Sequence, residues 1–153
     1  MKKSRTDERV SRDVAQSGWH VIGVIGDEKS PPFGYSVGLF ETFKHPEILI
    51  LGVEPKTAMG LVNDLGRAIE CGSVFAHGAK TTDLIEGYAC VFVKVPAKKY
   101  PAYVARATAF YGDAAFPLLQ CVWPDRDGHL PWDSGYEKAL ASEQPVLGRV
   151  PKK

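Results

Sequence analysis

A nearly unbroken apolar run at residues 47–53, Glu-Ile-Leu-Ile-Leu-Gly-Val, constrains the fold more than any other part of this chain. Such a run is typical of a strand that is buried on both faces, in the middle of a sheet. Two further β-type runs precede it, at residues 19–25 and 33–39. The short connections between these runs predict three strands that are antiparallel neighbours.

The run at residues 33–39 has an unusual distribution of side-chain sizes. Large residues alternate with small ones, so one face of the predicted strand carries only glycine and serine. A face without bulk permits close approach by a helix, by another backbone or by a ligand.

The remaining periodicities complete the predicted fold. Apolar residues spaced by three and four predict a helix that begins at Pro55 and ends before Gly72. We also expect a short strand within residues 74–85, strands over 88–95 and 116–122, a helix over about 99–111, and a short helix around 135–142. This order predicts an α+β fold with one mainly antiparallel sheet of about six strands, which could be barrel-like, and two main helices.

Length and composition indicate one folded unit. A domain of 153 residues buries roughly 70% of its unfolded surface. The polar residues 1–17 are expected to form an N-terminal arm or a short helix, residues 18–148 a single α+β domain, and residues 149–153 a tail.

Charge and cysteine content disfavour several classes of function. Nineteen basic and eighteen acidic residues leave a net charge of +1, so neither nucleic acid nor a membrane is an expected partner. Three cysteines without a Cys-x-x-Cys pair disfavour a disulfide framework or a zinc ribbon. Because the start resembles no signal peptide and no apolar stretch could span a bilayer, we expect a cytoplasmic protein.

Sequence motifs of the common catalytic mechanisms are missing. There is no Gly-x-Ser-x-Gly elbow and no phosphate-binding glycine loop. The four histidines are scattered, and we predict no metal site. The segment Asp125-Arg126-Asp127-Gly128 is similar to part of a calcium loop but lacks its later acids, and we interpret it as a turn that accepts its own backbone N–H groups.

A first candidate cluster surrounds the junction before the central strand. It comprises Tyr35, Ser36, His45 and Glu47, with Glu41 close by. A histidine beside carboxylates could act as a base or bind a metal. The alternative interpretation is that His45 and Pro46 shape a turn while Glu41 and Glu47 are solvated.

A second candidate cluster follows the last predicted strand and is rich in tryptophan and aspartate. Its members are Tyr111, Gln120, Trp123, Asp125, Arg126, Asp127, Trp132 and Asp133, of which all but Arg126 and Asp127 are candidate ligand-binding residues. The indole rings could pack a planar or apolar ligand that Gln120 and an aspartate orient. Alternatively, the tryptophans cap the core, and the same residue types also suit a protein interface.

These clusters carry a family resemblance. Residues 31–39 (Pro-Pro-Phe-Gly-Tyr-Ser-Val-Gly-Leu), 45–47 (His-Pro-Glu), 120–125 (Gln-Cys-Val-Trp-Pro-Asp) and 131–133 (Pro-Trp-Asp) resemble the bacterial domain of unknown function 4262 family. The resemblance covers about residues 18–148. It implies a domain boundary and no particular reaction. Residues 35–39 and 45–52 are also similar to early strands of flavin-reductase-like split barrels, with His45 in place of an aspartate.

The leading hypothesis is a small cytoplasmic domain that binds a small molecule or a protein partner through a Trp/Asp-rich pocket, with candidate ligand-binding residues from both clusters. The first alternative is a flavin-binding oxidoreductase in which Tyr35, Ser36 and Trp123 contact the ring system. The second alternative is a metal-assisted hydrolase, and whether the protein is an enzyme stays open. Exposed strand edges or the Trp-rich loop could form a homodimer.

Overall fold

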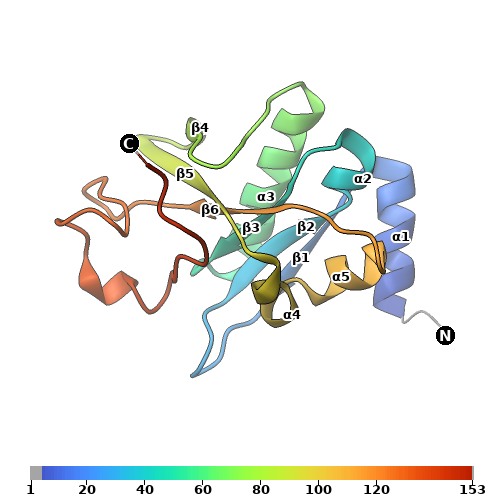
Figure 1. The fold of residues 1–153 in the computed structure, drawn as a ribbon, viewed down its shortest axis with the longest axis horizontal. Coiled ribbons are helices and arrows are strands. Elements are labelled where there is room, and N and C mark those ends of the chain that lie inside the picture. Colours follow the sequence, from blue (N-terminus) through green and yellow to red (C-terminus); the bar gives the residue numbers. More distant parts are fainter. Residues whose placement is uncertain (1–4, 153) are drawn as a thin grey trace.

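The computed structural model describes residues 5–152, which contain six strands in one open, mixed sheet (Figure 1). Across the sheet the order is β1 (His20–Val24), β2 (Phe33–Val37), β3 (Glu47–Leu51), β6 (Leu118–Val122), β5 (Tyr88–Lys94) and β4 (Lys80–Ile85). The predicted α+β class and the six strands are confirmed. The barrel-like closure is wrong, and the sheet is not purely antiparallel, because β3 and β6 run parallel.

The parallel pair results from the long path between its two strands. After β3 the chain forms α3 (Pro55–Glu70) and the β4–β5 hairpin. It then passes through a 3₁₀ helix (Ala97–Lys99) and two short α-helices before it returns as β6. Parallel neighbours require a crossover of this kind, whereas hairpins produce antiparallel ones. Both strands of the pair are buried along their whole length, which confirms the central position expected for residues 47–53.

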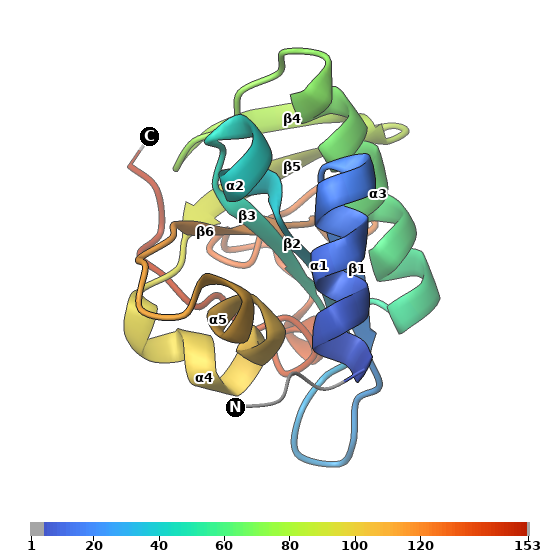
Figure 2. The ribbon, with the colours of Figure 1, turned by 90° about the vertical axis from the view of Figure 1, so that its right-hand side faces the viewer.

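Helices cover both faces of the sheet. Figure 2 shows α3 (green) on one side of the sheet and α4 (Tyr100–Tyr103) and α5 (Ala105–Tyr111) on the other. The buried residues of α1 (Arg5–Ser17) belong to the same core cluster as those of α5 and not to that of α3. α1 buries Val10 and Val14 against this second face. The helix predicted over 99–111 is interrupted at Val104, whose backbone leaves the helical region (φ −118°, ψ 48°) and whose side chain is fully buried.

The glycine and serine face of β2 is occupied by α3. A Cβ atom on Gly34 would lie 2.8 Å from the Cβ of Ala58 in this helix. The sequence permitted a helix, another backbone or a ligand on this face, and at Gly34 the structure has a helix. The contact brings helix and strand closer together than two larger residues would allow.

We expect Gly34→Ala to lower the free energy of unfolding by about 1–3 kcal/mol, because the added methyl group forces β2 and α3 apart. Urea titration followed by circular dichroism measures this loss. The matched control is Gly60→Ala in α3, where a Cβ atom would meet nothing within 4 Å. This control should be neutral or gain up to about 1 kcal/mol. Equal stabilities of the two variants would contradict close packing at Gly34.

Candidate functional site

Glu47, the first residue of β3, carries a fully buried carboxylate. It accepts hydrogen bonds from two side-chain hydroxyls and three backbone N–H groups: Ser36 Oγ (2.7 Å), Tyr111 Oη, Gly38 N (2.8 Å), Leu39 N (3.1 Å) and Phe40 N (3.3 Å). The backbone donors belong to the start of α2 (Leu39–Phe43), a helix without a side-chain cap of its own. The carboxylate therefore takes the place of that cap.

These contacts determine what Glu47 can do chemically. Burial raises the pKa of Glu47 above its ordinary value, and the donors partly offset this rise. Burial and the adjacent carboxylate also raise the pKa of Tyr111 well above its ordinary value, so its phenol stays protonated and donates. Both carboxylate oxygens are occupied, which suits an anchor rather than a general base. The interpretation of Glu47 as a solvated side chain is wrong.

His45 is also buried and uses both ring nitrogens. Its Nε2 accepts the backbone N–H of Phe75 (2.9 Å), so the neutral ring carries its proton on Nδ1 and donates it to the carbonyl of Pro46 (2.9 Å). Burial lowers the pKa of His45 below its ordinary value. The ring thus connects the start of β3 to the loop between α3 and β4.

Two glutamine side chains attach the C-terminal segment to the sheet. Gln120 in β6 is fully buried; its Nε2 donates to Pro145 O (2.8 Å), and its Oε1 accepts from Leu147 N (2.9 Å). Gln144 Oε1 accepts from Trp123 N (2.9 Å), and Gln144 Nε2 donates to Trp123 O (2.9 Å). Each amide pairs with the backbone as a neighbouring strand would. Gln144 was not predicted, because its partner lies 21 residues away.

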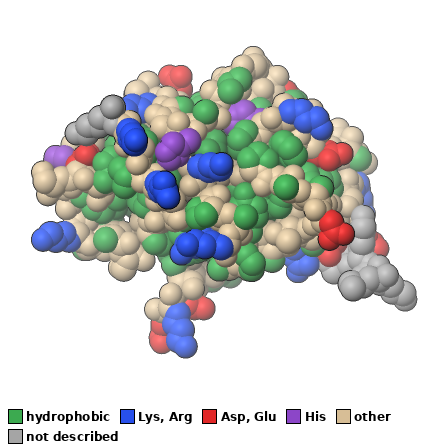
Figure 3. Space-filling model, in the orientation of Figure 1, with side chains coloured by type: hydrophobic (Ala, Val, Ile, Leu, Met, Phe, Trp, Pro, Cys, Tyr) green, Lys and Arg blue, Asp and Glu red, His purple; other side chains and the backbone are tan. Residues whose placement is uncertain are grey.

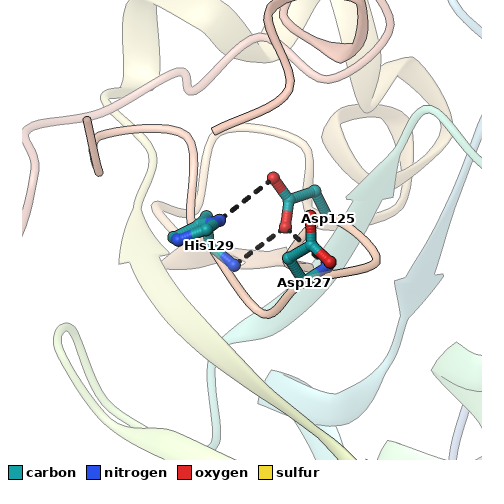
Figure 4. Close-up of side chains that lie close together, drawn as sticks. All are labelled: Asp125, Asp127 and His129. Atoms are coloured by element: carbon teal, nitrogen blue, oxygen red, sulfur yellow. Dashed lines mark hydrogen bonds and ion pairs between the residues drawn. The ribbon is translucent and has the colours of Figure 1, made fainter. Parts of the chain in front are cut away.

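The aspartates of the second cluster stabilise turns (Figure 4). Asp125 is 3% exposed and accepts the N–H groups of Asp127 (3.0 Å), His129 (2.9 Å) and Glu137 (2.9 Å). Burial opposes its charged form, but the three donors prevail and lower the pKa of Asp125 below its ordinary value. Asp133 likewise accepts the N–H of Leu130 (2.8 Å). The interpretation of residues 125–128 as a self-bonded turn is confirmed.

Asp125, Asp127 and His129 also bring three potential metal ligands together. One ligand atom from each lies within 4.8 Å of the others. The His129 side chain is 43% exposed, and its Nδ1 lies 3.6 Å from Asp125 Oδ2. Because the Asp125 oxygens already bind backbone donors, the turn accounts for this arrangement without a cation.

The structure thus distributes the predicted residues among several separate networks. It brings Ser36, Glu47 and Tyr111 together through hydrogen bonds. Tyr35, 2% exposed, bonds instead to the backbone of Arg106 through its hydroxyl. Gln120 and Trp123 bind the C-terminal segment, and Trp123 Nε1 also donates to Leu51 O. Asp125 and Asp133 each stabilise a turn. Trp132 is half-buried.

A groove of about 1090 Å³ is lined by none of the ten predicted residues. It is bounded by the end of β5, the short helices that follow it, the segment before β6 and the C-terminal segment. Its apolar lining includes Val95, Tyr100, Phe116, Pro117 and Leu147. Its basic residues are Lys94, Lys98, Lys99, Arg149 and His77, and no acidic residue lines it. In Figure 3 several blue side chains surround a green region on this face, with no red between them.

The cations of this groove have no ion-pair partner among the described residues. Within residues 5–152, none of Lys94, Lys98, Lys99 and Arg149 forms an ion pair. His77 accepts the backbone N–H of Lys94 at Nδ1 (2.9 Å), so its neutral ring carries the proton on Nε2 as a donor. An anion with an apolar body is the complement of this surface. The consecutive Lys98, Lys99 and Tyr100 were its only local signal in the sequence.

The fold and the groove define a small α+β domain with an open sheet, helices on both faces and a basic, apolar-lined groove. The chain belongs to the family called domain of unknown function (DUF4262), whose model matches residues 13–137, so the resemblance seen in the sequence is confirmed. No curated protein and no solved structure shows a significant match to the chain. No helix within residues 5–152 combines the length and apolarity needed to cross a membrane.

We expect Glu47→Gln to lower the free energy of unfolding by about 2–4 kcal/mol. The amide NH₂ group can only donate, so it would face N–H or O–H donors that now bind a carboxylate oxygen. Urea titration measures the change. The control Glu41→Gln alters an exposed carboxylate and should stay within about 0.5 kcal/mol of the wild type. If Glu47→Gln does not fold, Tyr111→Phe removes one donor and should still destabilise more than the control. Equal stability of Tyr111→Phe and the control would contradict the anchoring role.

The lowered pKa of His45 predicts a pH dependence of stability. The folded state holds the neutral ring, so it binds fewer protons than the unfolded chain between the folded pKa and the unfolded value of 6.5. This contribution is complete above pH 6.5 and is lost as the pH falls through the folded pKa. When the pH is lowered from 7.5 to 5.5, the urea midpoint of unfolding should therefore decrease more for the wild type than for His45→Gln. Equal decreases would contradict the assignment.

Proposed function

We propose that this domain binds a small anionic ligand with an apolar or aromatic body in the basic groove. The observation that carries the proposal is a combination seen within residues 5–152: four cations that form no ion pair, an apolar lining and no acidic residue in that lining. Like charges that cluster without partners repel one another, and a bound anion relieves that repulsion. The concave shape allows the apolar body to leave water at the same time.

Magnitudes indicate how the two parts of the ligand share the binding free energy. A solvent-exposed ion pair contributes about 0–1 kcal/mol, so no single lysine is sufficient. An apolar body that buries about 200 Å² contributes roughly 5 kcal/mol. Several charge contacts added to that body reach the region of micromolar affinity, which corresponds to about 8 kcal/mol. The ligand therefore requires both a charged group and an apolar part.

The groove is better suited to this role than the two clusters noted in the sequence. Binding through the Trp/Asp-rich cluster stays a prediction, but Gln120, Trp123 and Asp125 use polar atoms within the fold. The flavin alternative needs ring contacts from Tyr35 and Ser36, which are buried and hydrogen-bonded. Cytoplasmic location and homodimer formation also stay predictions.

The test uses 8-anilinonaphthalene-1-sulfonate, an aromatic anion whose fluorescence rises in apolar surroundings. We expect saturable binding to the folded wild type and affinity at least tenfold weaker for Lys98→Glu/Lys99→Glu. The control Lys56→Glu/Lys138→Glu makes the same charge change at exposed residues outside the groove and should bind as the wild type does. Thermal melting of each variant checks folding, because partly unfolded proteins also bind this dye.

Two results would overturn the proposal. One is the absence of dye binding to the folded wild type. The other is equal affinity of the two charge-reversed variants, which would place the dye elsewhere on the surface.

A further inference from the structure

We infer that Asp125, Asp127 and His129 form a site for a divalent metal ion, and that Zn²⁺ is the ion that fits it. This inference does not depend on the proposed function. One ligand atom from each of the three side chains lies within 4.8 Å of the other two (Figure 4). Imidazole nitrogens and carboxylate oxygens are both ligands that proteins use to bind zinc.

The observation that points to a ligand is the unpaired Nδ1 of His129. Within residues 5–152 it is the one buried side-chain nitrogen or oxygen without a hydrogen-bond partner. Its neighbour, Asp125 Oδ2, lies 3.6 Å away, which is too far for a hydrogen bond. The turn therefore explains the contacts of Asp125 but not the state of Nδ1. A buried nitrogen without a partner costs free energy, and a bound cation would remove that cost.

Both carboxylates keep acceptor positions that a cation can use. Asp125 Oδ1 accepts two backbone N–H groups, whereas Oδ2 accepts only that of Glu137. Because a carboxylate oxygen has two lone pairs, Oδ2 keeps one of them, and Oδ2 is the oxygen that lies 3.6 Å from His129 Nδ1. The Asp127 carboxylate is exposed and forms no hydrogen bond or ion pair within residues 5–152.

The spacing and chemistry of these atoms select the ion. Two ligands of a tetrahedral Zn²⁺ ion, each about 2.1 Å from the metal, lie about 3.4 Å apart. Neighbouring ligands of an octahedral Mg²⁺ ion lie about 3.0 Å apart. The 3.6 Å between Asp125 Oδ2 and His129 Nδ1 is closer to the tetrahedral value. The imidazole also favours Zn²⁺, since Mg²⁺ and Ca²⁺ prefer oxygen ligands.

The fold holds two of the three ligands in place before an ion binds. The backbone N–H of Asp125 donates to His129 O (2.8 Å), which closes the turn that carries both side chains. The exposed Asp127 completes the set by rotation of its side chain. Three protein ligands leave the fourth position of a tetrahedral ion to water, as in zinc sites that are open to a substrate.

The experiment titrates ZnCl₂ into untagged, chelator-treated protein and follows binding by isothermal titration calorimetry. Every protein carries Cys71→Ser, because Cys71 is the exposed cysteine and a thiolate also binds zinc. We expect saturable binding of one ion. Asp127→Asn changes a ligand that the fold does not use and should weaken binding by about tenfold or more. Asp113→Asn, the same change at an exposed residue that precedes β6 whereas the turn follows it, is the matched control.

His129→Gln tests the nitrogen ligand. It should weaken Zn²⁺ binding as Asp127→Asn does, and thermal melting of the metal-free proteins checks that both variants fold. Co²⁺ supplies a spectroscopic readout, because a tetrahedral Co²⁺ ion absorbs visible light far more strongly than an octahedral one. We expect this absorption in the protein with His129 and its loss in His129→Gln.

Three results would overturn the inference. The first is the absence of Zn²⁺ binding to the folded protein. The second is an affinity of Asp127→Asn or His129→Gln equal to that of Asp113→Asn, which would indicate an adventitious ion only. The third is tighter binding of Mg²⁺ or Ca²⁺ than of Zn²⁺, which would contradict an imidazole ligand. None of these results affects dye binding in the groove, so the two proposals fail independently.

Discussion

The buried carboxylate of Glu47 is the interaction on which the rest of the structure depends. A charge without water must be surrounded by donors, and here they come from β2, from the start of α2 and from α5. An apolar strand such as β3 packs equally well in several registers, whereas five hydrogen bonds to one side chain fit only one. The Glu47 network also contacts the wall of the groove. Its member Tyr111 stacks on Phe116 with ring centroids 4.7 Å apart, and Phe116 lines the groove.

The C-terminal segment depends on the same use of polar side chains in place of backbone. Gln120 and Gln144 each offer one donor and one acceptor at peptide-like spacing, so an irregular segment is attached without joining the sheet. This solution leaves residues 147–149 free to line the groove. These residues lie beyond the part of the chain that the family model matches, at 13–137. Most residues that line the groove therefore belong to the part of the chain that the family model matches, whereas residues 147–149 do not.

The sequence predicted those features that depend on neighbouring residues. The strands and α3 follow from local periodicity, and close packing at Gly34 follows from the small face of β2. Contacts between distant residues escaped prediction. The helix α2 was read as a connection because its cap, Glu47, comes later in the chain. The parallel β3–β6 pair was missed because nothing local indicates where a strand returns after a long crossover. The basic groove was missed because its cations come from separate segments and the net charge averages them.

Polar groups that stabilise the fold have partners within the protein, whereas groups that bind a ligand keep their binding capacity for it. The buried hydrogen-bond networks and the basic groove differ in this respect. Within residues 5–152, only one buried side-chain nitrogen or oxygen lacks a hydrogen-bond partner, Nδ1 of His129, so buried polar atoms otherwise serve the fold. The four cations of the groove contribute nothing comparable, because they carry the same charge and none of them forms an ion pair within those residues. Their mutual repulsion opposes folding. In the function that we propose, an anionic ligand supplies the partner that these cations do not have within residues 5–152.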